Sequence, residues 1–144
     1  EWYKSDKGKG MAYWYKQNGP HKGTFNNDKP NDGVSLEEEQ NDPNSLWNFY
    51  RKMITIRKTN PVISKGVYKT LSNDNNKVFS FMRYEGNDQF IVVVNLSDKP
   101  VTANIVRGLG NKLKVVYGDA APVISGSSMA LSLPAYGVAA MTSY

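Results

Sequence analysis

Residues 77–96 read KVFSFMRY, EGND and QFIVVVNL, two largely apolar stretches joined by four turn-forming residues. Stretches of this length that are rich in Val, Ile and aromatic residues and are bounded by Gly, Asn and Asp are typical of β-strands. Residues 90–94 are apolar at every position, so both faces of the second strand are expected to be covered. We therefore predict that this strand lies at the centre of a sheet.

Five more strands are expected on either side of this pair. They are predicted at residues 67–71, 101–105, 112–117, 129–133 and 137–143. Clusters of Asn, Asp, Ser, Gly and Pro separate them, and the strands recur about every 8–12 residues, a spacing typical of an antiparallel sandwich or barrel. The expected fold is therefore mainly β, an antiparallel β-sandwich that occupies residues 64–144.

The clearest helix is predicted at residues 42–58. Asp42 is a good N-cap, Pro43 suits the first helical position, and the helix should stop at Asn60, which precedes a proline. An apolar arc follows helical spacing and consists of Leu46, Trp47, Phe49, Tyr50, Met53, Ile54 and Ile56. An arc this wide and aromatic predicts that the helix packs against a large body rather than against a small sheet.

Residues 1–41 are expected to form a long irregular loop, because Gly, Pro, Asn and Asp are frequent and neither helical nor strand periodicity persists. The loop is too aromatic for a disordered segment, so it is expected to pack on something or to bind something. Exposed Trp and Tyr rings stack on the apolar faces of sugar rings. The candidate substrate-binding residues are Trp2, Tyr3, Trp14 and Tyr15. The alternative is that these rings only pack the loop onto a neighbouring part of the protein.

The charge varies along the chain although the net charge is only +5. Residues 31–45 carry five acids and no base, and residues 46–70 carry six bases and no acid. Most of these bases fall on the polar side of the predicted helix, which is typical of a solvated helix face, so we expect no nucleic-acid partner. No apolar run approaches 18 residues, so no membrane span is expected.

The residues offer little support for catalysis or metal binding within this chain. The absence of cysteine excludes a thiolate zinc site and a cysteine nucleophile. His21, the only histidine, lies in a Gly-rich loop without a nucleophile motif. Residues 37–39 are adjacent glutamates, which suit a helix dipole better than opposite sides of a glycosidic bond. Asp28, Asn31 and Asp32 lack the Gly and Glu positions of an EF-hand loop. We predict no catalytic residue and no metal ligand here.

Five short motifs occur in a characteristic order. They are DPNSL at residues 42–46, YRKMITIRK at 50–58, NP at 60–61, GVY at 66–68 and LPAYGV at 133–138. In this order they resemble the C-terminal part of an α-amylase of glycoside hydrolase family 13. In that family a (β/α)8 catalytic barrel is followed by a β-sandwich called domain C. The resemblance implies that residues 1–63 correspond to the end of the barrel, a long loop after strand eight and the last α-helix, and residues 64–144 to domain C.

The resemblance also carries expectations about function. The family is retaining, and its Asp nucleophile, Glu acid/base and second Asp come from barrel strands that have no counterpart here. The intact enzyme would hydrolyse α-1,4 bonds of starch or malto-oligosaccharides, and this chain alone would be inactive. Its partners would be the missing barrel portion and, through the parent enzyme, an α-glucan substrate.

No cofactor is expected in this chain, whereas calcium is compatible with the missing part of the parent enzyme. An extracellular or cell-surface location is favoured over a cytoplasmic one. A second hypothesis comes from a different functional class. A stand-alone carbohydrate-binding β-sandwich module would explain the strands and the aromatic loop, but not the wide apolar arc of the helix.

Overall fold

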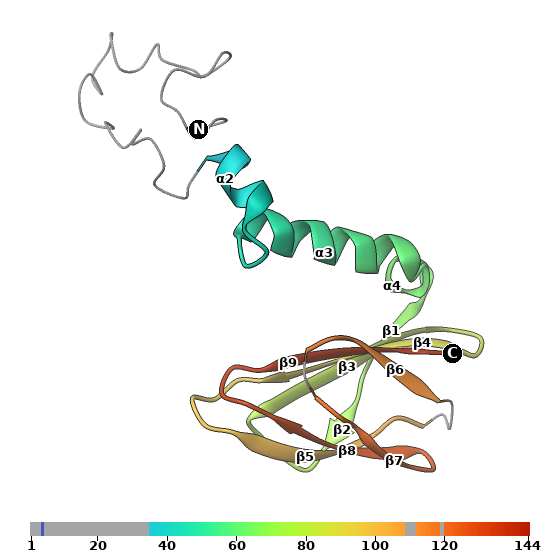
Figure 1. Cartoon of the computed structure of the whole chain (residues 1–144). Helices are drawn as coiled ribbons and strands as arrows, with labels where there is room; N and C mark the ends of the chain where they lie inside the picture. The colour runs from blue at the N-terminus through green and yellow to red at the C-terminus, as the bar shows by residue number, and fades with distance from the viewer. Residues whose placement is uncertain (1–3, 5–34, 109–111, 119) are drawn as a thin grey trace, which may run out of the picture. The chain divides into compact units, whose positions relative to one another are not determined.

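The computed structural model describes residues 4, 35–108, 112–118 and 120–144 (Figure 1). The chain is divided into two compact units, Glu1–Thr55 and Ile56–Tyr144. The division falls inside a helix because Ile56 already packs with buried residues of the second unit. The expected border between residues 63 and 64, as the border between a barrel and domain C, stays a prediction.

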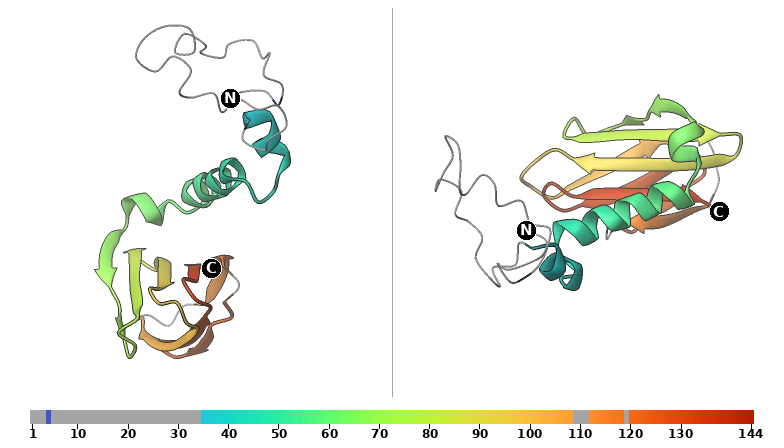
Figure 2. Two further views of the ribbon diagram at one scale, coloured as in Figure 1. Left: turned by 90° about the vertical axis from the view of Figure 1, so that its left-hand side faces the viewer. Right: turned by 90° about the horizontal axis from the view of Figure 1, so that it is seen from above.

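The second unit is a sandwich of two antiparallel sheets (Figures 1 and 2). The five-stranded sheet has the order β1-β3-β4-β9-β6, and the four-stranded sheet has the order β2-β5-β8-β7. The bounds of the strands are β1 Val67–Thr70, β2 Ser72–Asn73, β3 Val78–Glu85, β4 Asp88–Asn95, β5 Val101–Val106, β6 Leu113–Tyr117, β7 Val123–Ser125, β8 Ser128–Leu133 and β9 Val138–Ser143. The predicted mainly β fold and antiparallel sandwich are confirmed.

Strand β4 occupies the centre of the five-stranded sheet, as its continuous apolar run predicts. It pairs with β3 on one side, where Phe81 faces Val92, and with β9 on the other, where Val92 faces Ala140. Its inward-facing side chains include Ile91 and Val93, both fully buried. Pairing on both sides supplies hydrogen-bond partners for the backbone of β4, whose two side-chain faces are both largely covered.

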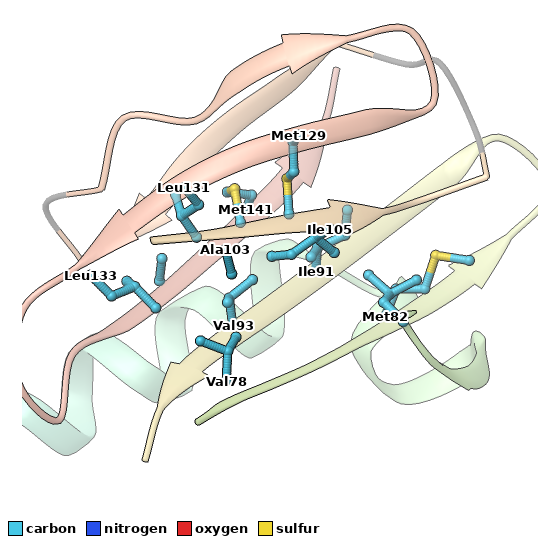
Figure 3. Close-up of a cluster of buried hydrophobic side chains, with 12 residues drawn as sticks. Val78, Met82, Ile91, Val93, Ala103, Ile105, Met129, Leu131, Leu133 and Met141 are labelled. Atoms are coloured by element: carbon cyan, nitrogen blue, oxygen red, sulfur yellow. The ribbon is translucent and has the colours of Figure 1, made fainter. Parts of the chain in front are cut away.

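The core fills the space between the two sheets (Figure 3). In β5 every second residue is buried, so Ala103 and Ile105 point inward while their neighbours point to solvent. The register places Ile105 opposite Met129 and Ala103 opposite Leu131, so these side chains form one layer of the core. Fully burying a side chain the size of Ile, Leu or Met contributes about 1.5–3 kcal/mol, so this layer stabilises the fold together with the facing layer of the other sheet.

Two strands are not expected from the sequence. Ser72–Asn73 has the polar composition of a turn, but it pairs with the end of β5 as the short strand β2. Val123–Ser125 forms strand β7 at the edge of the four-stranded sheet, where all three residues are exposed. Neither segment shows the alternation of a half-buried strand, since short edge strands bury little.

The described residues contain three helices, α2 Leu36–Asn41, α3 Leu46–Thr59 and α4 Val62–Lys65. The expectation of an irregular segment throughout residues 1–41 is therefore wrong for the six residues of α2. The predicted start of the long helix is also wrong, because Asp42 is the C-cap of α2 and α3 begins four residues later. Its end, just before Asn60, is confirmed.

Candidate functional site

The candidate substrate-binding residues Trp2, Tyr3, Trp14 and Tyr15 lie outside the described residues. Their assignment to sugar binding stays a prediction. The other features singled out by the sequence are the acidic segment at residues 37–39, the apolar arc of the long helix and the LPAYGV motif at residues 133–138. All three lie in the part of the chain that the structure describes.

The three glutamates at residues 37–39 form the first turn of α2. Ser35 is the N-cap, and its Oγ accepts the N–H of Glu38 at 3.3 Å while the Glu38 carboxylate accepts the N–H of Ser35 at 3.3 Å. This reciprocal arrangement is a capping box, which satisfies two backbone donors at the helix start. The acidic segment therefore complements the positive N-terminal end of α2. The expectation from the sequence was that it would complement the longer helix.

A dense set of hydrogen bonds joins α2 to α3. Asn48 lies in the first turn of α3, and its Nδ2 donates to the carbonyl oxygens of Glu39 at 3.0 Å and Asp42 at 2.8 Å. Ser45 Oγ donates to the same Glu39 oxygen at 2.6 Å and accepts the N–H of Asn48 at 3.2 Å. These bonds satisfy carbonyls that the C-terminal end of α2 leaves without intrahelical partners. They fix the angle between the two helices.

The apolar arc of α3 is largely exposed. Leu46 is 61% exposed, Tyr50 59% and Ile54 52%, and α3 has no fully buried residue. Arg51 lies over the ring of Trp47, with 5.3 Å between the guanidinium carbon and the ring centroid. A helix face with this many aromatic and aliphatic residues is normally covered, so its exposure marks an interaction surface.

Helix α4 covers part of the outer face of the five-stranded sheet. Val62 is buried against Phe90 of β4 and Ala140 of β9, and Ile56 at the end of α3 packs beside them. Arg83 of β3 donates from Nη2 to the carbonyl of Ser64 at 3.4 Å. These contacts attach the helical segment to the sandwich within the second unit.

An aromatic cluster that the sequence reasoning missed lies farther along the same outer face. We call Tyr68, Phe79 and Phe81 the aromatic strip. The ring centroids of Tyr68 and Phe81 are 5.5 Å apart, and those of Phe79 and Phe81 are 5.7 Å apart. The sequence contains a signal for this cluster, because residues 79 and 81 point to the same side of β3, opposite the side that carries the buried Val78 and Met82.

The turn before β9 is held by a buried asparagine. Asn95 donates from Nδ2 to the carbonyls of Lys99 and Pro134, both at 2.7 Å, and its Oδ1 accepts the N–H of Ser97 at 2.9 Å. Tyr136 has a φ of 53°, in the left-handed region that few non-glycine residues adopt, and its N–H donates to the Ser97 carbonyl at 2.9 Å. Residues 134–137 of the LPAYGV motif therefore form a turn that hydrogen bonds attach to the β4–β5 loop.

A shallow hollow of about 370 Å³ lies beside this turn. Its lining residues are Pro100, Val101, Thr102, Ser132, Leu133 and Pro134. The hydroxyls of Thr102 and Ser132 are 2.9 Å apart and hydrogen-bond to each other. Since the lining contains no ionisable side chain, the hollow offers no group for acid–base chemistry.

Two charged groups of the sandwich have shifted pKa values. The side-chain amide and the backbone N–H of Asn104 donate to Asp74 at 2.6 and 2.7 Å, and these bonds lower the pKa of that carboxyl. Burial lowers the pKa of Arg107, whose Nη2 donates to the carbonyl of Gly126 at 3.0 Å. Both groups tie loops to strands, so their surroundings indicate structural roles.

Within the described ranges, no group of three or more His, Asp or Glu side chains is placed to hold a metal ion. In that part of the chain there is also no helix long and apolar enough to cross a membrane. The site residues therefore amount to exposed aromatic and aliphatic surfaces without a catalytic constellation among the described residues.

Curated proteins similar to this chain include an oligo-1,6-glucosidase and an alpha-amylase. The chain is 33% identical over 66 residues to an oligo-1,6-glucosidase of Parageobacillus thermoglucosidasius, which is 46% of this chain and 12% of that protein. It is 28% identical over 68 residues to alpha-amylase 3 of Dictyoglomus thermophilum, which is 47% of this chain and 14% of that protein. The matched region thus spans less than a sixth of the length of either relative.

Solved structures give the same result over more of the chain. The alpha-amylase from H. orenii matches 100% of this chain and 27% of its own, with a TM-score of 0.68 and 25% sequence identity. Isomaltulose synthase from Klebsiella sp. LX3 matches 87% of this chain and 23% of its own, with a TM-score of 0.61 and 26% identity. The resemblance to the C-terminal part of α-amylase-family enzymes is therefore confirmed.

A family model assigns the sandwich to a specific domain family. The model described as Maltogenic Amylase, C-terminal domain matches residues 68–139, from β1 into the start of β9. This match covers half of the chain and includes most of the strands described above. The chain consequently belongs to the maltogenic amylase C-terminal domain family, within the α-amylase group of glycoside hydrolases.

Proposed function

We propose that this chain is the C-terminal part of an α-amylase-like retaining glycoside hydrolase that acts on starch or malto-oligosaccharides. The proposal is supported by the match of the whole chain to about a quarter of a solved alpha-amylase. The intact enzyme would hydrolyse α-1,4-glucosidic bonds. The chain itself would supply the end of the catalytic barrel and domain C, without the catalytic carboxylates.

The observation that carries this proposal is the uncovered apolar arc of α3. Leu46, Tyr50 and Ile54 are all more than half exposed, and a helix face of this kind is expected to have a neighbour. The polypeptide that precedes the matched region in the longer relatives is the neighbour we propose. In the complete barrel α3 would be one of the outer helices, and the missing barrel portion would bury its apolar arc.

Substrate contacts would come from the residues that precede α2. We assign α-glucan stacking to Trp2, Tyr3, Trp14 and Tyr15, because loops on the C-terminal face of a barrel border its active site. The named relatives include both an oligo-1,6-glucosidase and an alpha-amylase. A substrate panel should therefore contain both α-1,4- and α-1,6-linked glucans.

Incubation of the purified 144-residue chain with soluble starch, followed by an assay of reducing ends, tests the proposed division of labour. We expect no release above the blank, since the three carboxylates of the retaining mechanism belong to the rest of the enzyme. Release at an enzyme-like rate would overturn the proposal.

Affinity electrophoresis in starch gels addresses the alternative of a stand-alone binding module. Strong retardation of the chain that Trp14→Ala abolishes would favour that module, whereas weak or absent retardation supports the proposal. Trp47→Ala is the matched control, because it removes an indole from α3 and not from the residues that precede α2.

A further inference from the structure

Two polar side chains point into the interior at one end of the sandwich. Gln89 of β4 and Arg107, the residue that follows β5, are both fully buried. Gln89 points to the same side as Ile91, and Arg107 to the same side as Ile105, because alternate residues of a strand share a face. Ile91 and Ile105 belong to one buried cluster between the two sheets (Figure 3). The two polar side chains therefore lie at the margin of this cluster.

The connection between β4 and β5 places Gln89 and Arg107 at the same end of the interior. A short loop joins the end of β4 in one sheet to the start of β5 in the other. The start of β4 therefore lies at the same end of the sandwich as the end of β5. The pairing of β5 with its neighbour extends to Arg107, whose N–H donates to the carbonyl of Ser127 at 2.8 Å. Gln89 and Arg107 consequently approach this end of the interior from opposite sheets.

The side-chain amide of Gln89 lacks the hydrogen bonds that a buried amide needs. Its Nε2 and Oε1 are both buried, and neither atom has a hydrogen-bond partner among the described residues. The backbone of Gln89 is satisfied, since its N–H donates to Ser143 Oγ at 2.8 Å and its carbonyl accepts the Thr142 hydroxyl at 3.3 Å. Buried polar groups in proteins are nearly always satisfied by protein atoms or by ordered water.

The surroundings of this amide supply further polar groups. Arg107 brings a guanidinium into the interior, where burial lowers its pKa, and its Nη2 donates to the carbonyl of Gly126 at 3.0 Å. On the adjacent strand β9, the side chain next to Gln89 is the small hydroxyl of Ser143. A buried water makes about three hydrogen bonds to polar groups around it. Gln89, Arg107 and Ser143 together meet this requirement.

We propose that at least one ordered water molecule binds between the two sheets and bridges the amide of Gln89 to the guanidinium of Arg107, with the Ser143 hydroxyl as a third partner. The water would donate to Gln89 Oε1 and accept from Gln89 Nε2 or from the guanidinium. Such a site would link the two sheets at this end of the sandwich. It does not depend on the substrate of the parent enzyme, so its failure would leave the proposed function untouched.

The pattern of donors and acceptors selects water over an ion. Oε1 of Gln89 can only accept a hydrogen bond, and an anion has no hydrogen to give. A metal cation could contact Oε1, but the positive charge of Arg107 would repel it. Water donates and accepts, so it alone among these three satisfies both the amide oxygen and the guanidinium.

Oxygen-17 magnetic relaxation dispersion tests the proposal, because its amplitude reports water molecules that stay inside a protein longer than the protein takes to tumble. We would measure the 144-residue chain and the variant Gln89→Met, which keeps the length of the side chain and removes the amide. The amplitude should fall by the contribution of at least one water. Gln40→Met is the matched control, since it removes an exposed amide from α2 and should leave the amplitude unchanged. An unchanged amplitude in folded Gln89→Met would overturn the proposal.

A second measurement on the wild-type chain covers the case in which Gln89→Met does not fold. Nuclear Overhauser contacts with water are recorded at the carbon-bound Hγ protons of Gln89 and the Hδ protons of Arg107. These protons do not exchange with solvent, so contacts with the sign of a long-lived water are expected at both side chains. Absence of such contacts at Gln89 would overturn the proposal, as would a hydrogen bond from its amide to another part of the chain.

Discussion

At the scale of single residues, backbone conformation sets the strictest demands. Gly118 has a φ of 85°, and a Cβ at this position would lie 2.1 Å from the carbonyl oxygen of Val138. Gly86 has a φ of 57°, but nothing lies within 4 Å of the position of its Cβ. The two glycines therefore separate the cost of a left-handed conformation from the cost of a steric clash.

We predict that Gly118→Ala destabilises the fold far more than Gly86→Ala. The left-handed conformation alone costs about 1–2 kcal/mol, so Gly86→Ala should lose about that amount of unfolding free energy. Gly118→Ala must in addition displace β9, and we expect a loss of more than about 4 kcal/mol. Urea denaturation of both variants measures the difference, and equal losses would contradict the close approach of residue 118 to β9.

Asp74 makes the stability of the sandwich depend on pH. Its hydrogen bonds from Asn104 lower the pKa of the carboxyl in the folded state. A carboxyl with a lowered folded-state pKa stabilises the fold above its unfolded-state pKa, and the contribution is lost as the pH falls through the folded-state value. The relevant window lies below about pH 4, the ordinary range of an aspartate.

We predict that Asp74→Asn is less stable than the wild type at pH 7, and that the difference shrinks as the pH is lowered to about 3. The difference in unfolding free energy between the two proteins, measured at both pH values, checks this. Asp98→Asn controls for the loss of one exposed carboxylate. A difference that stays constant with pH would show that the charge of Asp74 is not what Asn104 stabilises.

At the scale of elements, the junction between α2 and α3 is held by the side-chain amide of Asn48 together with Ser45. Asn48 satisfies carbonyls at the end of α2 from a position in the first turn of α3. We predict that Asn48→Ala destabilises this junction by about 0.5–1.5 kcal/mol, because the carbonyl of Gln40 loses its Asn48 donor while the carbonyls of Glu39 and Asp42 keep donors from Ser45.

Amide hydrogen exchange of residues 38–42, compared with wild type, measures the effect of Asn48→Ala on α2. Asn44→Ala is the matched control, since the hydrogen bond of Asn44 to Asp42 comes from its backbone N–H and survives the substitution. Equal exchange in both variants would assign the stability of the junction to Ser45 alone.

Element boundaries also show what sequence patterns can and cannot predict. The strands with long apolar runs, above all β3 and β4, are predicted correctly because their periodicity is local. The start of α3 is not, because Asp42 is a suitable cap by composition and only the presence of α2 makes it a C-cap. Ser72–Asn73 has the sequence of a turn and is not predicted as a strand. It becomes one by pairing with β5, which lies more than thirty residues farther along the chain.

At the scale of the whole molecule, the exposed apolar surfaces of α3 and of the five-stranded sheet dominate the behaviour of the isolated chain. We predict that the isolated chain binds the dye ANS and that Phe49→Ser with Tyr50→Ser lowers the fluorescence at least twofold, because exposed apolar patches of this size bind apolar ligands. Lys52→Ser with Lys58→Ser is the control on the same helix. Unchanged fluorescence in the aromatic variant would show that the arc is covered within the chain.

The order of residues along the chain was enough to predict the class of fold, the central position of β4, the end of the long helix and the kinship with the C-terminal part of α-amylase-family enzymes. These features follow from short-range patterns of apolar residues and turn residues. Three others emerged only from the folded chain: which sheet face stays apolar, how Asn48 and Asn95 join separate segments, and the exposure of the aromatic arc of α3. Such features depend on contacts between residues that are far apart in the sequence. Local patterns of apolar and turn residues do not specify those contacts.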